Sequence, residues 1–361
     1  MSAPDPVTVG DRTNPLALAN HTNPVGDRSN LAEFVDRNCL VTGGLGFVGS
    51  NVAVRLAQAG ARVTVIDALI PRHGGSHANL RDHGLADGTI DVVVADIADV
   101  AATSSVVSTA EFIFNCAGQV SHVDSMEDPL GDLAINSASQ LQFLETIRRV
   151  NPGAVVVYAS TRQIYGKPRY LPVDEEHPIV PVDVNGVNKF SGEQFHVLYA
   201  KTYDLRACAL RLTNIYGPRQ RLLGDHHGVL PVFIRKALQG QTIQLFGDGL
   251  QARDVLHVDD VVDAFARAAL APEMAGEVFN IGSPEKLTLR SIAETIVAAS
   301  GTKARVELEP WPHDRLKIDI GSYATDCSKA KRMLGWDAAT SFTEGIAETM
   351  EYFRERMVEY L

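Results

Sequence analysis

The sequence predicts an α/β fold in which a parallel β-sheet carries helices on both faces, followed by a smaller lobe. Three observations predict it. Short apolar runs alternate with helical periods from Leu40 to about Arg211, a cluster of glycines stands where the first run ends, and an acidic residue, Asp67, stands where the second run ends. Alternating strands and helices form parallel sheets, and such sheets bind their ligands at the carboxyl ends of the strands.

The glycine cluster has the spacing GxxGxxG at Gly43, Gly46 and Gly49. In a dinucleotide-binding loop the first glycine allows a tight turn, the second lets backbone N–H groups approach a pyrophosphate, and the third lets the helix pack close to the strand. A helical period over Val52–Gln58 follows, with its positive N-terminal end toward the phosphates. Taken alone, the glycines fit a plain β–α turn equally well.

Asp67 strengthens the nucleotide interpretation. It ends the second strand, Arg62–Ile66, about 20 residues after the glycines, where a carboxylate accepts hydrogen bonds from an adenosine ribose. An acidic side chain there repels a 2′-phosphate, so we predict NAD rather than NADP, and a doubly wound sheet of the Rossmann type. The alternative is that Asp67 caps the segment that follows it.

The next elements bring more residues to the same edge of the sheet. The third strand, Ile90–Val94, ends near Asp96 and Ile97, which we place at the adenine. The fourth, Phe112–Asn115, leads into small residues that let the backbone lie against a ribose, namely Cys116, Ala117 and Gly118. A helix over Ala134–Arg148 directs Asn136 to the sheet, and the strand Ala154–Ala159 delivers Ser160 and Thr161.

After Arg211 the alternation loosens. A polar loop through His226 and His227 is followed by shorter elements, with helices expected at Pro231–Leu238, Asp259–Leu270, Leu289–Ala299 and Phe342–Glu359 and a strand at Ile243–Phe246. We therefore divide the chain into an irregular tail over 1–35, a nucleotide-binding domain over 36–211 with returning segments near 250–282, and a mainly substrate-binding lobe over 212–361. This lobe is discontinuous because its segments interleave with returns to the main sheet.

Composition excludes several classes of function. The chain has 33 basic and 44 acidic residues, a formal net charge of −11, which argues against nucleic acid as a partner. Its four cysteines are widely separated and form no CxxC pair, so we predict free thiols, no metal site and a reducing compartment. No apolar run reaches membrane-spanning length and the N-terminus has no signal-like apolar segment, so we expect a cytoplasmic protein without membrane contact.

Many motifs in order now carry a family resemblance: Thr42–Gly49, Asp67, Asp96-Ile97, Asn115–Gly118, Ser160-Thr161, Tyr165-Gly166, Lys189, Arg211–Arg219, Arg253-Asp254 and Ser328–Trp336. From about Arg37 to Arg354 the chain resembles an extended short-chain dehydrogenase/reductase of the NAD-dependent epimerase/dehydratase family, of the UDP-glucose 4-epimerase and CDP-paratose 2-epimerase type. The resemblance implies tightly held NAD and transient oxidation of a sugar hydroxyl, after which inversion, elimination or decarboxylation is possible. It also implies a homodimer formed through helices near 132–149 and 189–203, and a cofactor loop that includes Phe47 and Val48.

The catalytic residues of this family are a Ser or Thr, a Tyr and a Lys, the last two spaced YxxxK. Thr161 and Lys189 match, but Asn185 stands where the tyrosine belongs, and an amide cannot take up a proton at neutral pH. Three interpretations follow. Another residue serves as base, either His122, whose ordinary pKa suits the task, or Tyr165; Lys189 acts directly or through water; or the redox chemistry is lost. For His122 the alternative is a histidine bonded to Asp124 or facing solvent.

A second departure lies beside Thr161. The family's 4,6-dehydratases carry an Asp-Glu pair after the threonine as acid and base, whereas this chain has Arg162 and Gln163, which disfavours that mechanism. Arg162 can bind a carboxylate or phosphate, or be capped by Asp174 or Glu175. The resemblance implies further contacts with a nucleotide sugar or nucleoside at Gln119, Asn214, Arg219, Arg253 and Arg315, although Arg253 and Asp254 can equally form a structural salt bridge.

A nucleotide-sugar epimerase is the leading hypothesis, with a dehydratase and a non-catalytic NAD-binding protein as alternatives.

Overall fold

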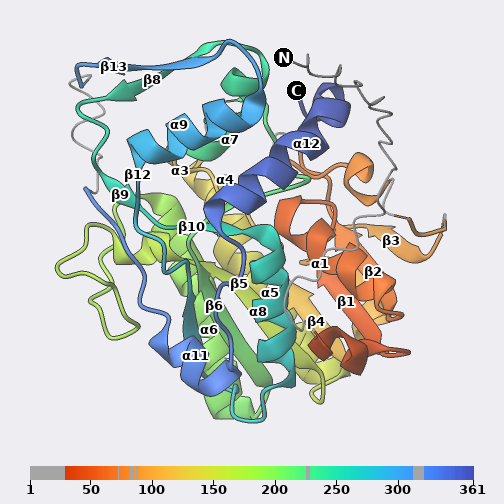
Figure 1. Cartoon of the computed structure of the whole chain (residues 1–361). Helices are drawn as coiled ribbons and strands as arrows, with labels where there is room; N and C mark the ends of the chain where they lie inside the picture. Colours follow the sequence, from red (N-terminus) through yellow and green to blue (C-terminus); the bar gives the residue numbers. More distant parts are fainter. Residues whose placement is uncertain (1–28, 72, 82–83, 87, 225–227, 312–320) are drawn as a thin grey trace, which may run out of the picture.

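A computed structural model describes residues 29–71, 73–81, 84–86, 88–224, 228–311 and 321–361. Its central sheet has seven parallel strands in the order β11-β6-β5-β4-β1-β2-β3 (Figure 1). Their bounds are β1 Asn38–Thr42, β2 Arg62–Asp67, β3 Ile90–Val94, β4 Phe112–Asn115, β5 Val155–Thr161, β6 Arg206–Leu212 and β11 Val278–Ile281. The predicted parallel α/β fold is confirmed. The strand order reverses between β1 and β4, which is where doubly wound sheets bind ligands.

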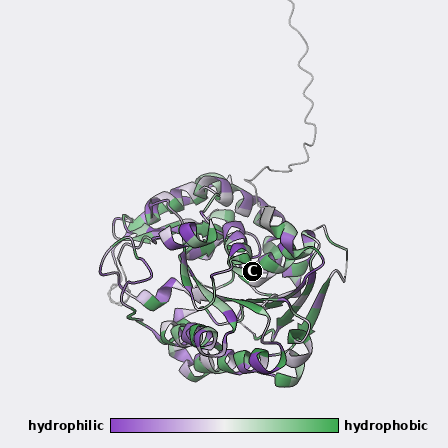
Figure 2. Ribbon diagram, turned by 90° about the horizontal axis from the view of Figure 1, so that it is seen from below, coloured by the Kyte–Doolittle hydropathy of each residue, from purple (hydrophilic) through white to green (hydrophobic). Residues whose placement is uncertain are grey.

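Helices cover both faces of the sheet. The alternation of side chains along β1 shows why: Val41 packs into a core with α1 (Phe47–Gln58) and α8 (Val258–Leu270), whereas Leu40 packs into a second core with α2 (Val100–Val107), α5 (Ser139–Val150) and α6 (Val184–Tyr203). Both β1 side chains are almost fully buried. Figure 2 shows the apolar strands between two helical layers.

Three local expectations needed correction. The first helix, α1, begins at Phe47 rather than Val52, directly after Gly46, so the glycine loop itself forms its N-terminus. The helix expected over 134–148 is interrupted: a π-helical turn, Ala134–Ala138, joins α4 (Pro129–Leu133) to α5. The tail is not irregular up to residue 35, because Ser29–Phe34 form a 3-10 helix that buries the Phe34 ring against Phe112 and Phe114.

A second group of elements forms the C-terminal lobe at the top of Figure 1. Ile234 of α7 (Val229–Leu238), Ile292 of α9 (Leu289–Ser300) and Ile346 of α12 (Phe342–Tyr360) share a separate apolar core. Small two-stranded sheets complete it, pairing β7 (Asn214–Tyr216) with β10 (Val255–His257), β8 (Thr242–Phe246) with β13 (Arg305–Glu309), and β9 (Ala252–Arg253) with β12 (Leu287–Thr288). Between these elements the chain returns to the main sheet as β11, and α11 (Ser328–Leu334) packs on β11.

Short helices lie at the carboxyl edge of the sheet, where they position the site. They are η2 (His77–Leu80), α3 (His122–Glu127) and η4 (Arg162–Tyr165). Among the described residues, no helix combines the length and apolar character that crossing a membrane requires.

Candidate active site

A cavity opens at the carboxyl ends of β1, β2 and β4. It is lined by the glycine loop and by most of the residues predicted to hold the cofactor, namely Gly43, Gly46, Phe47, Val48, Gly49, Asp67, Asp96, Ile97, Cys116, Ala117 and Gly118. The N–H groups of a helix's first turn have no partner within the helix, and the first turn of α1 lines this cavity. The edge of the sheet therefore presents free donors and a positive helix end to an anion.

Close packing explains the glycine loop. Gly43 has a φ of +63°, and a Cβ there would lie 2.8 Å from the backbone of Ala117. A Cβ on Gly49 would lie 2.3 Å from the carbonyl oxygen of Gly43. Both positions therefore exclude any larger residue, as a dinucleotide loop with tight helix–strand packing requires.

Asp67 organises the nucleotide side of the cavity. Its carboxylate accepts hydrogen bonds from the backbone N–H groups of Leu45 at 3.0 Å and Leu69 at 2.8 Å. Through its bond to Leu69 it also caps the loop that follows β2, as the alternative expected, although the next helical segment, η2, starts only ten residues later at His77. A carboxylate has four lone-pair sites, so ribose hydroxyl groups can still donate to it. These residues fit an adenosine dinucleotide such as NAD.

Lys189 is buried next to the cavity residue Gly118. Its Nζ donates to the carbonyl oxygen of Ala159 at 2.7 Å and lies 4.6 Å from the centre of the Tyr158 ring. The side chain is 4% exposed, and burial lowers the pKa of Lys189 to about 8. Because Thr161 follows Ala159 by two residues on β5, both residues retained from the family pattern converge on the end of this strand.

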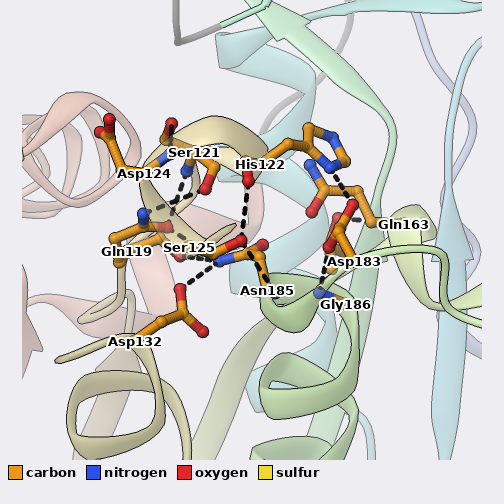
Figure 3. A network of polar contacts seen from close by, with 11 residues as sticks. Gln119, Ser121, His122, Asp124, Ser125, Asp132, Gln163, Asp183, Asn185 and Gly186 are labelled. Carbon is orange, nitrogen blue, oxygen red and sulfur yellow. Dashed lines mark hydrogen bonds and ion pairs between the residues drawn. The ribbon is translucent and has the colours of Figure 1, made fainter. Parts of the chain in front are cut away.

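Asn185 is buried at the position of the missing tyrosine and faces a polar network (Figure 3). Its Nδ2 lies 2.9 Å from both the backbone and side-chain oxygens of Gln119 and 3.0 Å from Oδ2 of Asp132, so three acceptors share two hydrogens. Its backbone N–H donates to Ser125 Oγ on α3. Asn185 thus ties α6 to the loop that follows the cavity residue Gly118.

A buried carboxylate, Asp132, anchors the other side of this network. It accepts hydrogen bonds from three asparagine amides, those of Asn136, Asn185 and Asn188, at 3.0, 3.0 and 2.8 Å. Asn136 also bonds to the backbone of Gln119: its Oδ1 accepts from the Gln119 N–H, and its Nδ2 donates to the Gln119 carbonyl oxygen. Asn136 therefore lies in the buried position expected from the sequence, although its partners are this network.

His122 is the first residue of α3 and is half-exposed. Its Nδ1 forms a short hydrogen bond with Oδ2 of Asp183, the residue that caps the N-terminus of α6 through a 2.7 Å bond from Gly186 N–H. The expected alternative partner was Asp124, and the structure instead joins His122 to Asp183 (Figure 3). The imidazole is therefore held by the helix that carries Asn185 and Lys189.

Tyr165 is not placed to act as a base. Its hydroxyl donates to Asn280 Oδ1 at 2.7 Å and accepts from Arg211 Nη1 at 2.7 Å, and the side chain is fully buried. Burial raises the pKa of Tyr165. Arg211 in turn forms a buried ion pair with Glu193 at 2.7 Å, so the phenol is held within the fold rather than at the cavity.

Arg162 lies next to Thr161 on η4. It donates to Asn214 Oδ1 at 3.1 Å and stacks over Tyr323, with 4.6 Å from the guanidinium carbon to the ring centre. The expected caps have other partners, because Asp174 bonds to Tyr170 and Glu175 to the backbone of Asn280. The oxygen Oε1 of the neighbouring Gln163 is buried without a hydrogen-bond partner.

The remaining predicted substrate residues are dispersed. Arg253 donates to the backbone carbonyls of Ala252 and Gly321, while Asp254 accepts from Thr213 and Thr325. Arg219 does not line the cavity: its φ of 70° turns the side chain back to Asn51 Oδ1 and Asn79 O, and Arg221 lines the cavity instead. Arg315, His226 and His227 lie outside the described residues.

Sequence reasoning missed several residues around the site. Asp183 and Asp132 are polar partners of predicted residues, and Val120, Ile135, Ser139 and Arg221 line the cavity. For Asp183 a local signal existed, because an aspartate directly before a helix is a typical N-cap. Asp132 had no such signal.

Comparison with known proteins agrees with this geometry. The model of the NAD-dependent epimerase/dehydratase family matches residues 39–282. A UDP-glucose 4-epimerase of Mycolicibacterium smegmatis is 35% identical over 88% of this chain and 98% of its own length. A dTDP-glucose 4,6-dehydratase of Streptomyces antibioticus is 32% identical over 88% of this chain and 92% of its own length.

Solved structures extend the likeness to the fold. The crystal structure of a Thermotoga maritima UDP-glucose 4-epimerase with UDP-glucose has a TM-score of 0.79 and 31% identity, covering 89% of this chain and 99% of that one. The chain therefore belongs to the NAD-dependent epimerase/dehydratase family.

Proposed function

We propose that the protein is a nucleotide-sugar epimerase that oxidises a sugar hydroxyl transiently and inverts a stereocentre before the hydroxyl is restored. The observation that carries the proposal is the pairing of a complete dinucleotide cavity with Lys189 and Thr161 at the end of β5. NAD, when bound in this cavity, would supply the acceptor for a hydride from the sugar carbon and the donor that restores it.

The residues of the chain itself have separate roles in this proposal. The glycine loop and the first turn of α1 bind the pyrophosphate, and Asp67 binds the adenosine ribose. The Lys189 ammonium stabilises negative charge that develops on oxygen, and the Thr161 hydroxyl orients the reacting sugar hydroxyl. Arg162 supports binding of an oxygen-rich substrate beside Thr161. Gln163, Asn214 and Arg253 complete the proposed substrate contacts, whereas the buried Gln119 amide is bonded to Ser121 and Asn185.

Elimination of water is the alternative that the site favours less. Arg162 and Gln163 stand where the family's 4,6-dehydratases carry an acid and a base, and neither side chain exchanges a proton at neutral pH. Because the relatives include both epimerases and dehydratases, the product decides between the two reactions.

Mass spectrometry and chromatography of the products test the proposal directly. The purified protein is incubated with added NAD and a panel of UDP-, dTDP-, CDP- and GDP-sugars and nucleosides. We expect a product of unchanged mass and altered retention, and no turnover by Thr161→Ala or Lys189→Met. A product lighter by one water would establish the dehydratase reaction instead, and a protein that binds NAD but converts nothing would support a non-catalytic role.

We also propose a homodimer in the cytoplasm. Large apolar side chains are exposed on three mutually packed helices, including Met126 on α3 (61%), Leu130 on α4 (75%) and Val187 on α6 (54%). An exposed apolar surface of this kind is typical of a protein interface. The four cysteines are free, as expected in a reducing compartment. Light scattering tests the dimer: Leu130→Glu should yield a monomer, whereas Val358→Glu on α12 should not.

A further inference from the structure

We propose that the His122–Asp183 pair replaces the missing tyrosine as the acid–base group, and that Asn185 is the positioning residue that holds His122 in place. This inference rests on the proposed function, because it assigns the proton transfer that transient oxidation of a hydroxyl requires. The residues concerned lie on the loop that contains Gln119 and on helices α3, α4 and α6. Figure 3 shows them together.

The contacts form a closed ring. Asn185 on α6 donates to Gln119, and the Gln119 amide bonds to the backbone of Ser121 in both directions, at 3.0 and 2.7 Å. The Ser121 hydroxyl caps α3, whose first residue is His122. His122 then bonds to Asp183, which caps the N-terminus of α6 two residues before Asn185.

This closed ring of hydrogen bonds explains the role of the asparagine at position 185. A carboxamide donates two hydrogens, and both are directed to acceptors on Gln119 and Asp132 within a site that is 1% exposed. Asn185 therefore touches the loop that positions the imidazole rather than the reacting atoms. A group held by packing and by further hydrogen bonds keeps the geometry that catalysis needs.

The hydrogen-bond pattern prepares His122 to accept a proton. An ionised carboxylate only accepts hydrogen bonds, so the bond to Asp183 requires a proton on His122 Nδ1. In the neutral ring Nε2 then carries a lone pair. As the hydride leaves the sugar carbon for the cofactor, the hydroxyl proton moves to Nε2, and Asp183 stabilises the imidazolium that forms. When the hydride returns to the ketone carbon, Nε2 returns the proton, so the cycle closes without net change.

Neighbours of the pair belong to both the cofactor cavity and the segment that carries Thr161. Gln119 directly follows Gly118, which lines the cofactor cavity. On the other side is Gln163, two residues after Thr161; Figure 3 shows its side chain beside the His122–Asp183 pair, and its Oε1 is buried without a partner. The proposal therefore places the reacting sugar hydroxyl between Thr161 and the exposed His122 side chain.

The other candidate bases are less available. The Tyr165 hydroxyl is fully buried against Arg211 and Asn280, and Lys189 Nζ already donates to Ala159 O from a buried position. The elements that meet at His122 carry several carboxylates, and the imidazole bonds to the one at the N-cap of α6, Asp183. The others are Asp124 and Glu127 on α3, Asp128 and Asp132 at and on α4, and Glu193 on α6.

Nitrogen NMR of the full-length, 15N-histidine-labelled protein tests the arrangement without turnover. The His122 signals are assigned by their loss in His122→Gln. We expect the neutral ring to carry its proton on Nδ1, and we expect this preference to disappear in Asp183→Ser, which keeps an N-cap residue on α6 but removes the carboxylate. A His122 ring protonated on Nε2 in the unmodified protein would overturn the proposal, whether or not a substrate is known.

Kinetics with the nucleotide sugar that is converted in the panel provide the second test. His122→Gln should lower kcat about 10²- to 10⁴-fold, the usual contribution of a general base, and remove the acidic limb of the pH–rate profile. Asn185→Ala should lower kcat less and retain that limb, because His122 remains. His77→Gln, which removes an exposed histidine on η2, is the control. Full activity of His122→Gln would refute the assignment while leaving the epimerase proposal intact, whereas an inactive unmodified protein would count against the epimerase proposal.

Discussion

Removal of the Asp132 carboxylate is the perturbation whose effect follows most directly from the structure. Asp132 is 2% exposed and accepts hydrogen bonds from three asparagine amides. Asp132→Leu leaves one amide hydrogen of Asn136 and one of Asn188 without an acceptor in a dry site, whereas Asn185 keeps its two acceptors on Gln119. Each unpaired buried donor costs about 1–3 kcal/mol. We therefore expect the free energy of unfolding to fall by at least about 2 kcal/mol. Asp132→Asn should cost less, because Asn188 can turn its amide and present its oxygen.

Urea unfolding of the NAD-free protein, followed by circular dichroism, measures this difference. Asp128→Asn is the matched control, because Asp128 is exposed, caps the same helix α4, and is replaced by an equally good N-cap residue. The same variants also report on the cofactor site: Asp132 raises the pKa of Lys189, so Asp132→Leu should lower that pKa further below its value of about 8. If Asp132→Leu unfolds at the same urea concentration as the unmodified protein, the three hydrogen bonds do not stabilise the fold as argued.

Three further predictions concern the cofactor site and the core. Since the Lys189 ammonium loses its proton as pH rises through about 8, kcat/KM should fall across that range, and a flat profile from pH 7 to 9 would show that its charge is not used. Gly49→Ala places a Cβ 2.3 Å from Gly43 O and should weaken NAD binding at least about tenfold by calorimetry, whereas Gly153→Ala, whose Cβ meets its nearest neighbour at 3.8 Å, should not. Arg211→Met leaves the buried Glu193 carboxylate without its cation and should lower the free energy of unfolding in urea by about 3–5 kcal/mol. Arg290→Met, which removes an exposed pair with Glu294, should change that free energy little. Equal effects of the two substitutions would contradict the argument.

The fold was predictable because its signals are local. The apolar run at β1, the glycines after it and the acidic end of β2 each report on a few neighbouring residues, and parallel strands bring their ends together automatically. Element boundaries were less accurate where a helix begins in glycines, as α1 does, or passes through a π-turn, as after α4. In both places the backbone departs from the regular period that a sequence pattern measures.

The site was predictable only in part, because its polar partners come from distant segments. Asn185 could be recognised as a departure, but its acceptors Gln119 and Asp132 lie 66 and 53 residues away. Tyr165 looked available in sequence, yet Arg211 and Asn280, 46 and 115 residues away, enclose its hydroxyl. Likewise, no pattern distinguishes Arg219 from Arg221. One backbone torsion in the left-handed region turns the first away from the cavity.

Asn185→Tyr distinguishes a rebuilt active site from a damaged one. If the asparagine merely replaced a catalytic tyrosine, restoring the phenol next to Lys189 should raise the rate. The structure predicts the opposite, because a ring at a position that is 1% exposed overpacks the site, at a cost of about 1–3 kcal/mol, and its single hydroxyl hydrogen cannot serve the acceptors on both Gln119 and Asp132. The loop that leads to His122 would then lose its anchor. We therefore expect Asn185→Tyr to lower kcat and the urea midpoint together, and a faster enzyme of unchanged stability would show that the asparagine holds nothing in place.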